Sequence, residues 1–111
     1  MSFFSFFRGG AVKPMDIQDG VVSFRKTAGA VLLDVRTHQE YVTGHIPGSV
    51  NLPLSDLAKI SFPKSTPLYV YCASGSRSSR ASSWLQKHGY HPVNIGGIYS
   101  YHGDLKTGGE S

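Results

Sequence analysis

The chain has 111 residues, a formal net charge of +4 and a composition that is 40% hydrophobic and 16% charged, which is typical of one compact soluble domain. No apolar run approaches the ~20 residues that a membrane-spanning helix needs. The single cysteine, Cys72, excludes an internal disulfide and a multi-thiolate metal site, and the five histidines lack zinc-type ligand spacing, so we expect no metal and no cofactor.

The first half of the chain begins with an arm rich in phenylalanine, over residues 1–14, which fits a secretory signal poorly because no basic region precedes its apolar part. We expect this arm to pack on the domain, with a contact to a membrane surface or a partner as the alternative. A helix over residues 16–27 and a buried strand over residues 30–35 follow. Thr37 and Glu40 then form a capping box, which predicts the start of a short helix.

The second half continues this alternation of strands and helices. A short strand and a brief helix lead to a loop, and a strand, a helix with one apolar stripe and a last short strand follow. These segments are predicted at residues 49–52, 57–60, 68–71, 76–88 and 92–95. Such alternation predicts an α/β fold, with a small parallel sheet of about five strands and helices on both faces. We expect the domain over residues 15–106 and a tail over residues 107–111.

Acidic residues are missing from a long part of the chain. No Asp or Glu occurs between Leu57 and Gly103, and the same segment carries five basic residues. They are Lys59, Lys64, Arg77, Arg80 and Lys87. We expect this half to attract anions, unless the charges only form a solvated basic face. Nucleic-acid binding is disfavoured because the basic residues are dispersed and match no reader motif.

Cys72 directly follows the predicted strand over residues 68–71, so it lies at the carboxyl end of a parallel strand, where sites form. A loop of mostly small residues comes next. It consists of Ala73, Ser74, Gly75, Ser76, Arg77 and Ser78. The N–H groups of this loop and of the following helix start can cradle an anion. Together with the arginines they favour negative charge on the sulfur, which predicts a reactive thiolate.

A cradled thiolate can accept a sulfur atom or attack phosphorus. Four residues separate Cys72 from Arg77, one fewer than in the cysteine phosphatases, and no aspartate that could serve as a general acid lies in the loop or just after it. The tighter cradle suits a single sulfur bonded to Cys72 better than a phosphate above it. An inert cysteine at a strand end is the other interpretation, but it does not call for a Gly/Ser loop, a helix start and arginines.

Three segments resemble the single-domain rhodaneses, a family of sulfurtransferases. The stretch "LLDVRTHQEYVTGHIPGSVNLP" (Leu32–Pro53) resembles the signature before the catalytic loop, "YCASGSRS" (Tyr71–Ser78) the active-site loop, and "GGIYSY" (Gly96–Tyr101) the C-terminal motif. The resemblance implies a rhodanese-like domain that acts as a thiosulfate sulfurtransferase. The Cys72 thiolate takes the outer sulfur of thiosulfate or a similar donor, sulfite leaves, and cyanide or a thiol removes the sulfur from the Cys72 persulfide.

The resemblance also implies roles for single residues. The loop N–H groups would stabilise the persulfide, and Arg77 would hold the incoming thiosulfate or departing sulfite, unless it pairs with a helix carboxylate or a carbonyl. Asp34 would support the site by hydrogen-bonding nearby loop backbone, and Arg36 would pair with Glu40 four residues on. His45 is expected to be a hydrogen-bonding residue rather than a catalyst.

The chain departs from the family pattern in two places. Tyr101 stands where tryptophan is usual, which affects local packing, and Ser74 and Ser76 replace bulkier or charged residues, which bears on donor preference.

Other functions stay open beside the enzyme. The first alternative is a sulfur-relay module that exchanges persulfide sulfur with a partner protein, and the others are a cysteine-dependent phosphatase or arsenate reductase and a non-catalytic binding domain. We expect a cytoplasmic protein, because a lone cysteine fits a reducing compartment. Its expected partners are a small anionic sulfur donor, a cyanide or thiol acceptor and a protein donor or acceptor, with no nucleic acid and no transmembrane segment.

Overall fold

The computed structural model describes residues 14–111. Its elements are α1 (Ile17–Lys26), β1 (Val31–Asp34), α2 (His38–Thr43), β2 (Ser49–Asn51), the 3-10 helix η2 (Leu54–Lys59), β3 (Pro67–Cys72), α3 (Ser76–Lys87), β4 (His91–Gly97) and the 3-10 helix η3 (Ile98–Ser100). The arm predicted over residues 1–14 lies, apart from Pro14, outside the described residues, so its packing stays a prediction.

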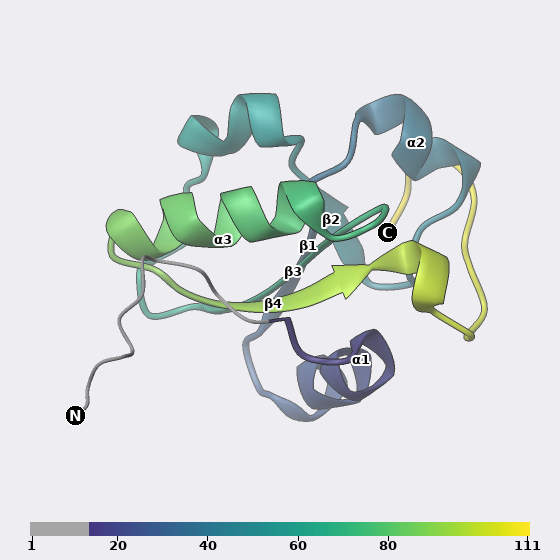
Figure 1. The fold of residues 1–111 in the computed structure, drawn as a ribbon, viewed down its shortest axis with the longest axis horizontal. Helices are drawn as coiled ribbons and strands as arrows, with labels where there is room; N and C mark the ends of the chain where they lie inside the picture. Colours follow the sequence, from purple (N-terminus) through teal and green to yellow (C-terminus); the bar gives the residue numbers. More distant parts are fainter. Residues whose placement is uncertain (1–13) are drawn as a thin grey trace.

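The strands of the described chain form one parallel sheet in the order β2-β1-β3-β4. Helix α1 covers one face, and α3 with η2 covers the other (Figure 1). The predicted α/β fold is confirmed, with four strands in residues 14–111 rather than about five. The chain after β4 turns into η3 and then pairs only through a single antiparallel bridge between Lys106 and His45, so it adds no fifth strand.

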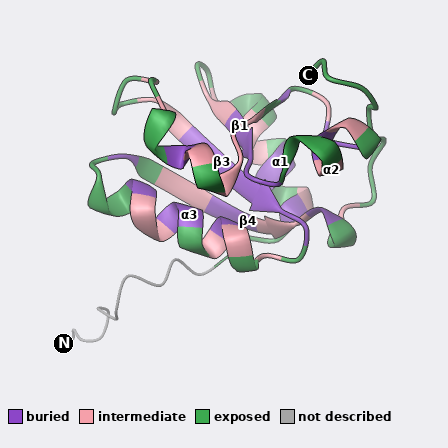
Figure 2. Ribbon diagram, turned by 90° about the horizontal axis from the view of Figure 1, so that it is seen from above, coloured by how far each residue is buried: buried purple, intermediate pink, exposed green. Residues whose placement is uncertain are grey.

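Adjacent residues of the central strands point to opposite faces of the sheet and fill two cores. Leu33 and Val70 pack with Leu85 of α3, whereas Leu32 packs with Val21 of α1 and with residues of β4. Figure 2 shows the sheet buried between its helices. Burial on both faces explains why the segments at β1 and β3 are continuous apolar runs rather than alternating ones.

The capping box predicted for α2 is confirmed. The Thr37 hydroxyl accepts a hydrogen bond from the Glu40 N–H, and the Glu40 carboxylate accepts one from the Thr37 N–H. The brief helix predicted at residues 57–60 is instead the 3-10 helix η2, which begins three residues earlier, after Pro53. No side chain caps its first turn, unlike the first turn of α2.

The sheet order places two loops beside each other. From β1 the chain crosses to β2 at one edge, and from β3 it crosses to β4 at the other edge. The connections that leave β1 and β3 therefore diverge at neighbouring strand ends, which is the switch point where α/β sheets bind ligands. Helix α2 follows β1 there, and the loop after Cys72 follows β3. Within residues 14–111, no helix is long and apolar enough to cross a bilayer.

Candidate active site

Cys72 is the last residue of β3, and its sulfur accepts hydrogen bonds from two backbone N–H groups of the following loop. The Gly75 N–H donates to Sγ over 3.1 Å, and the Ser78 N–H donates over 3.2 Å. Ser78 lies in the first turn of α3, so one donor comes from the turn and the other from the helix start. Backbone N–H groups are the donors that an anion cradle needs, and the reactive thiolate stays a prediction.

The loop is fixed from several sides. Gly75 has φ +110°, a left-handed conformation that glycine adopts without strain, and it caps the start of α3. The Ser78 hydroxyl donates to the carbonyls of Gly75 (3.0 Å) and Gly96 (3.3 Å), and the Tyr99 N–H donates to the Ala73 carbonyl (3.2 Å). The end of β4 and η3 thus hold the cradle in place.

The sulfur lies beneath the loop rather than on the surface. Cys72 is fully buried and Ala73 is buried beside it, whereas Ser74 and Ser76 are exposed. The loop therefore covers the sulfur in this structure.

Arg77 forms a two-pronged ion pair with Glu40. Its Nη1 donates to Glu40 Oε1 over 2.6 Å, and its Nη2 donates to Oε2 over 2.9 Å. The hydrogen bonds from Arg77 lower the pKa of Glu40 to about 2. The hydrogen bonds to Glu40 and its charge raise the pKa of Arg77, and the charge of Cys72 adds to this effect, so the ion pair lies within electrostatic reach of the sulfur. Of the two roles expected for Arg77, the structure contains the pairing with a helix carboxylate.

Glu40 belongs to this site, although the sequence motifs do not mark it as a site residue. The sequence contains a signal for its position. The capping box places Glu40 at the start of α2, which follows β1, and β1 lies next to β3 in the sheet. The long segment without acidic residues suggested an uncompensated positive charge, but folding brings an acid from outside that segment onto Arg77.

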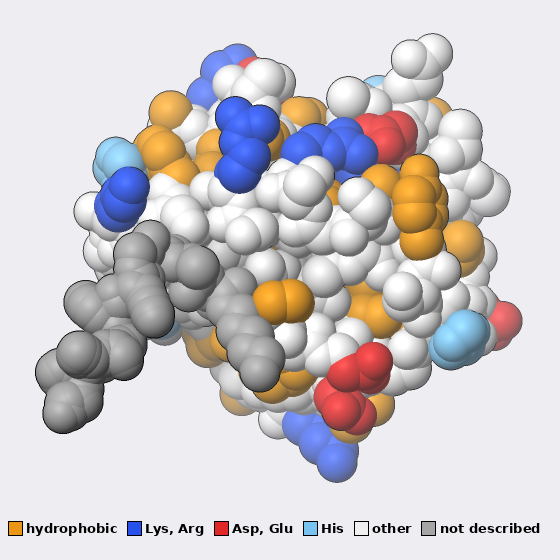
Figure 3. Space-filling view, viewed as in Figure 1, with side chains coloured by type: hydrophobic (Ala, Val, Ile, Leu, Met, Phe, Trp, Pro, Cys, Tyr) orange, Lys and Arg blue, Asp and Glu red, His pale blue; other side chains and the backbone are white. Residues whose placement is uncertain are grey.

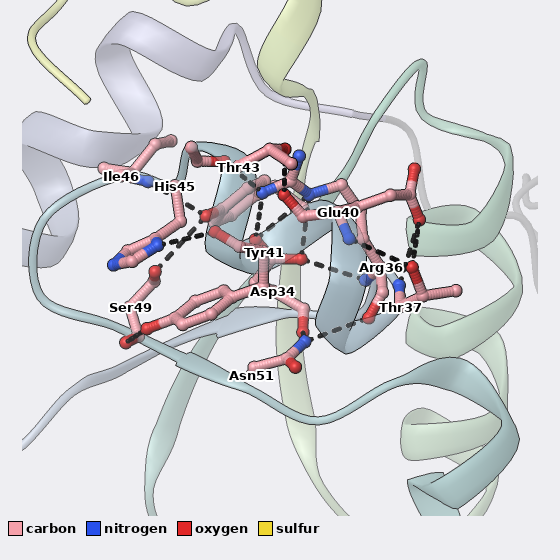
Figure 4. A network of polar contacts seen from close by, with 12 residues as sticks. Asp34, Arg36, Thr37, Glu40, Tyr41, Thr43, His45, Ile46, Ser49 and Asn51 are labelled. Carbon is pink, nitrogen blue, oxygen red and sulfur yellow. Dashed lines mark hydrogen bonds and ion pairs between the residues drawn. The ribbon is translucent and has the colours of Figure 1, made fainter. Parts of the chain in front are cut away.

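Arg36 pairs with Asp34, and the predicted ion pair between Arg36 and Glu40 is wrong. Arg36 Nη2 lies 2.7 Å from Asp34 Oδ2 and also donates to the Gly44 carbonyl (Figure 4). The Asp34 carboxylate accepts the Arg36 N–H as well, so it also holds the backbone just after β1. Burial lowers the pKa of Arg36, but the hydrogen bond and charge of Asp34 outweigh it and raise the pKa above its usual value. A buried carboxylate holds the guanidinium more tightly than a half-exposed one.

Replacing Asp34 with alanine is expected to lower the free energy of unfolding by about 3–5 kcal/mol, because it leaves the guanidinium of Arg36 buried without its counter-ion. The Arg36 and Asp34 side chains are 6% and 0% exposed. Urea unfolding measures the loss. Asp56→Ala, which breaks the exposed pair with Lys59, is the control and should change stability by no more than about 0.5 kcal/mol. Equal effects of the two substitutions would contradict the prediction.

His45 is buried and hydrogen-bonded, as expected. Its Nδ1 lies 2.8 Å from the Tyr41 carbonyl and its Nε2 lies 2.7 Å from the Glu110 carbonyl, and its ring stacks on Tyr41. These contacts tie the C-terminal segment to α2 and leave His45 with a packing role. Tyr101, in the place of the usual tryptophan, is half-buried against the core on the α1 face.

The other basic residues contribute unequally to the surface. Lys59 pairs with Asp56, and Lys64 donates to the carbonyl of His88. Arg80 is exposed and lines a hollow with Trp84 and residues of η2. Figure 3 shows basic side chains above α3, with an acidic side chain against one of them. Among residues 14–111, no three side chains of His, Cys, Asp or Glu are grouped so that they could hold a metal ion.

Comparison with known proteins places this geometry in a family. Residues 19–104 match the family model described as Rhodanese-like domain. A crystal structure of a rhodanese-like domain protein from Staphylococcus aureus superposes with a TM-score of 0.76 at 28% identity, covering 86% of this chain and 98% of that one.

Curated relatives show the same likeness in sequence. A sulfurtransferase of Allochromatium vinosum is 37% identical over 79 residues, which cover 68% of this chain and 74% of that protein. The uncharacterized protein YqhL of Bacillus subtilis is 40% identical over 82 residues, which cover 70% of this chain and 65% of that protein. The chain spans less than two thirds of the length of the first curated relatives that it matches.

Proposed function

The chain belongs to the Rhodanese-like domain family of sulfurtransferases, and from this premise we propose that it moves a sulfane sulfur from thiosulfate or a similar donor to cyanide or a thiol through a persulfide on Cys72. One observation carries the proposal. The only cysteine of the chain lies at the carboxyl end of β3, with the N–H groups of Gly75 and Ser78 directed at its sulfur.

In the first half-reaction the Cys72 thiolate attacks the outer sulfur of thiosulfate. A bond forms between Sγ and that sulfur, the sulfur–sulfur bond of thiosulfate breaks, and sulfite leaves with the electron pair. In the second half-reaction cyanide or a thiolate attacks the outer sulfur of the persulfide and regenerates the Cys72 thiolate, which is ping-pong catalysis. No general acid is needed, because sulfite and the thiolate are stable anions.

The cradle stabilises the charge that the persulfide carries. The N–H groups that bond the thiolate are fixed by the hydrogen bonds of Ser78 and Ala73, so they need little reorganisation when the charge moves to the outer sulfur. We assign the loop from Ala73 to Ser78 as the anion-binding part of the site. Arg77 is its charged member, and it contacts the departing sulfite at the expense of its bonds to Glu40.

A sulfur-relay role is the second candidate, and one observation favours it. Cys72 is the only cysteine among these 111 residues, so the thiol that resolves the persulfide comes from outside them. A relay differs from the enzyme in its partner rather than its chemistry. Slow turnover of thiosulfate together with fast exchange of sulfur with a protein thiol would identify it. A phosphatase role is disfavoured by the four-residue spacing between Cys72 and Arg77.

Intact-protein mass spectrometry after treatment with thiosulfate tests the proposal. The reduced chain should gain the mass of one sulfur atom, cyanide should remove it, and peptide mapping should place it on Cys72. A chain that stays unmodified with thiosulfate and with a small-molecule persulfide, while its thiol can still be alkylated in the native state, would contradict sulfur transfer.

A further inference from the structure

The ion pair between Arg77 and Glu40 lies at the edge of the cradle loop, within electrostatic reach of Cys72, and we call this edge the mouth of the cradle. Both terminal nitrogens of Arg77 bond to Glu40, one to each carboxylate oxygen, which is the geometry of a strong, oriented ion pair. The two side chains are 31% and 33% exposed, so solvent and small anions can reach the pair. The one charged residue inside the cradle loop therefore has its charge balanced before any substrate arrives.

Glu40 is held in this position independently of Arg77. Its Oε1 also accepts hydrogen bonds from the N–H (3.0 Å) and the hydroxyl (3.1 Å) of Thr37, as part of the capping box that starts α2. Figure 4 shows Glu40 turned back toward Thr37. These bonds fix the position of the Glu40 carboxylate. A substrate anion that binds Arg77 in place of Glu40 therefore lies next to a negative charge that stays where it is.

The two kinds of sulfane-sulfur donor differ in the charge that they bring to this mouth. Thiosulfate carries two negative charges, and the sulfite that leaves carries both of them. A small-molecule persulfide carries at most one negative charge on its sulfurs, and none in the protonated form R–S–SH that the thiolate attacks. Like charges brought together near a partly buried site repel each other strongly, so a fixed carboxylate there acts against thiosulfate far more than against a persulfide.

We propose that Glu40 is a positioning residue that sets donor preference: by neutralising Arg77 it turns the cradle away from dianionic donors such as thiosulfate and toward persulfides of low charge. This inference rests on the proposed function and names the substrate class of the same site. Arg80, the next basic residue on α3, does not replace Arg77, because it lines a hollow toward η2 with Trp84.

The step for a persulfide donor balances without a further reactant. The Cys72 thiolate attacks the outer sulfur of R–S–SH, the sulfur–sulfur bond of the donor breaks, and R–S⁻ leaves with the electron pair. The proton on the transferred sulfur passes to R–S⁻, which gives R–SH and the ionised persulfide of Cys72. One negative charge is present before and after the step, whereas three are present in the step with thiosulfate.

Donor selectivity in three variants tests the role of Glu40. Because the mechanism is ping-pong, kcat/KM for the donor reports the first half-reaction alone, with cyanide as a fixed acceptor. The readout is the ratio of kcat/KM for thiosulfate to kcat/KM for cysteine persulfide. The carboxylate and ammonium groups of cysteine persulfide cancel, so its net charge is at most the single negative charge of its persulfide group. We expect Glu40→Gln to raise this ratio about tenfold, the size expected for removing one screened like charge from the mouth.

Arg77→Gln should change the ratio in the opposite direction. It leaves the Glu40 carboxylate uncompensated, so the ratio should fall by about tenfold, and the double variant Glu40→Gln/Arg77→Gln should return close to the wild-type ratio. These opposite signs separate charge from misfolding, because damage to the fold slows both donors together. Asp56→Asn, which removes a negative charge of the surface pair with Lys59, is the matched control and should leave the ratio unchanged.

Two results would overturn the inference. One is a ratio in Glu40→Gln that stays within about twofold of wild type or falls. The other is a ratio in Arg77→Gln that rises. If neither donor places sulfur on Cys72 in the folded wild-type chain, the proposed function itself fails and this inference fails with it, whereas sulfur transfer with an unchanged ratio overturns only the inference.

Discussion

Cys72→Ser is expected to abolish sulfur transfer, with a loss of kcat of at least about 10³-fold. The reaction needs a thiolate that attacks sulfur and then holds it as a persulfide. The hydroxyl of serine stays protonated at neutral pH and is a poor nucleophile without a neighbouring base. Among residues 14–111, no histidine or carboxylate bonds to the Cys72 sulfur, which accepts hydrogen bonds from two backbone N–H groups. The thiosulfate:cyanide assay and the mass gain after thiosulfate treatment measure the loss.

The control for this prediction has to address the core, because Cys72 is fully buried beside Leu33 and Val70. Cys72→Ala removes the nucleophile without burying a hydroxyl and should show the same loss of activity. Circular dichroism should show that both variants remain folded. Ser61→Ala, at an exposed position away from the cradle, should keep wild-type activity. Activity near the wild-type level in either Cys72 variant would mean that another group carries the sulfur.

Local signals in the sequence predicted most of the elements. The apolar spacing before Thr27 predicted α1, and the capping box of Thr37 and Glu40 predicted α2, because both patterns act over one or two helical turns. The same holds for Cys72 and its loop. A strand end, small residues and a helix start are all local, so the two N–H donors to the sulfur could be anticipated.

Long-range contacts could not be read in the same way. The four-residue spacing of Arg36 and Glu40 predicts an ion pair between them. Instead, Arg36 bonds to Asp34, and Glu40 bonds to Arg77, which is 37 residues away. The choice among partners depends on burial. Asp34 ends a central strand and is buried, so its carboxylate needs a nearby counter-ion, which is the guanidinium of Arg36. Glu40 therefore pairs with Arg77 in the helix that starts after Cys72.

The role of Gly97 could be predicted only in part from the sequence. The motif "GGIYSY" marked the position, but only the fold shows what its second glycine contacts. A Cβ at Gly97 would lie 2.3 Å from the Ala73 carbonyl oxygen and 2.7 Å from Ser74 Cα. The backbone of Gly97 is extended, with φ −121°, so the glycine is needed for space rather than for its backbone angle. The backbone of Ala73 and Ser74 packs directly against Gly97.

Gly97→Ala is expected to lower kcat by about 10²-fold while the domain stays folded. The two clashing groups are backbone atoms, so the methyl group cannot be accommodated by turning a side chain. The sheet is held by the pairing of β3 with β1 on its other side, whereas the loop is held by single hydrogen bonds, so the loop moves. Displacement of Ala73 and Ser74 carries the Gly75 N–H away from the sulfur and weakens the cradle, which the rate of persulfide formation reports.

Gly96→Ala is the matched control, because the neighbouring glycine has the opposite properties. Gly96 has φ +87°, which strains any other residue, but the nearest atom to its Cβ would be Pro14 Cβ at 4.0 Å. Alanine there should lower stability by about 1 kcal/mol through backbone strain, with a much smaller effect on persulfide formation. Two results would contradict this prediction: activity of Gly97→Ala within about twofold of wild type, or losses of activity in both variants that only follow their losses of stability. Either result would mean that the cradle does not depend on the close packing of the loop against Gly97. A large loss of activity confined to Gly97→Ala would show that space beneath the loop, and not backbone freedom, keeps the N–H donors on Cys72.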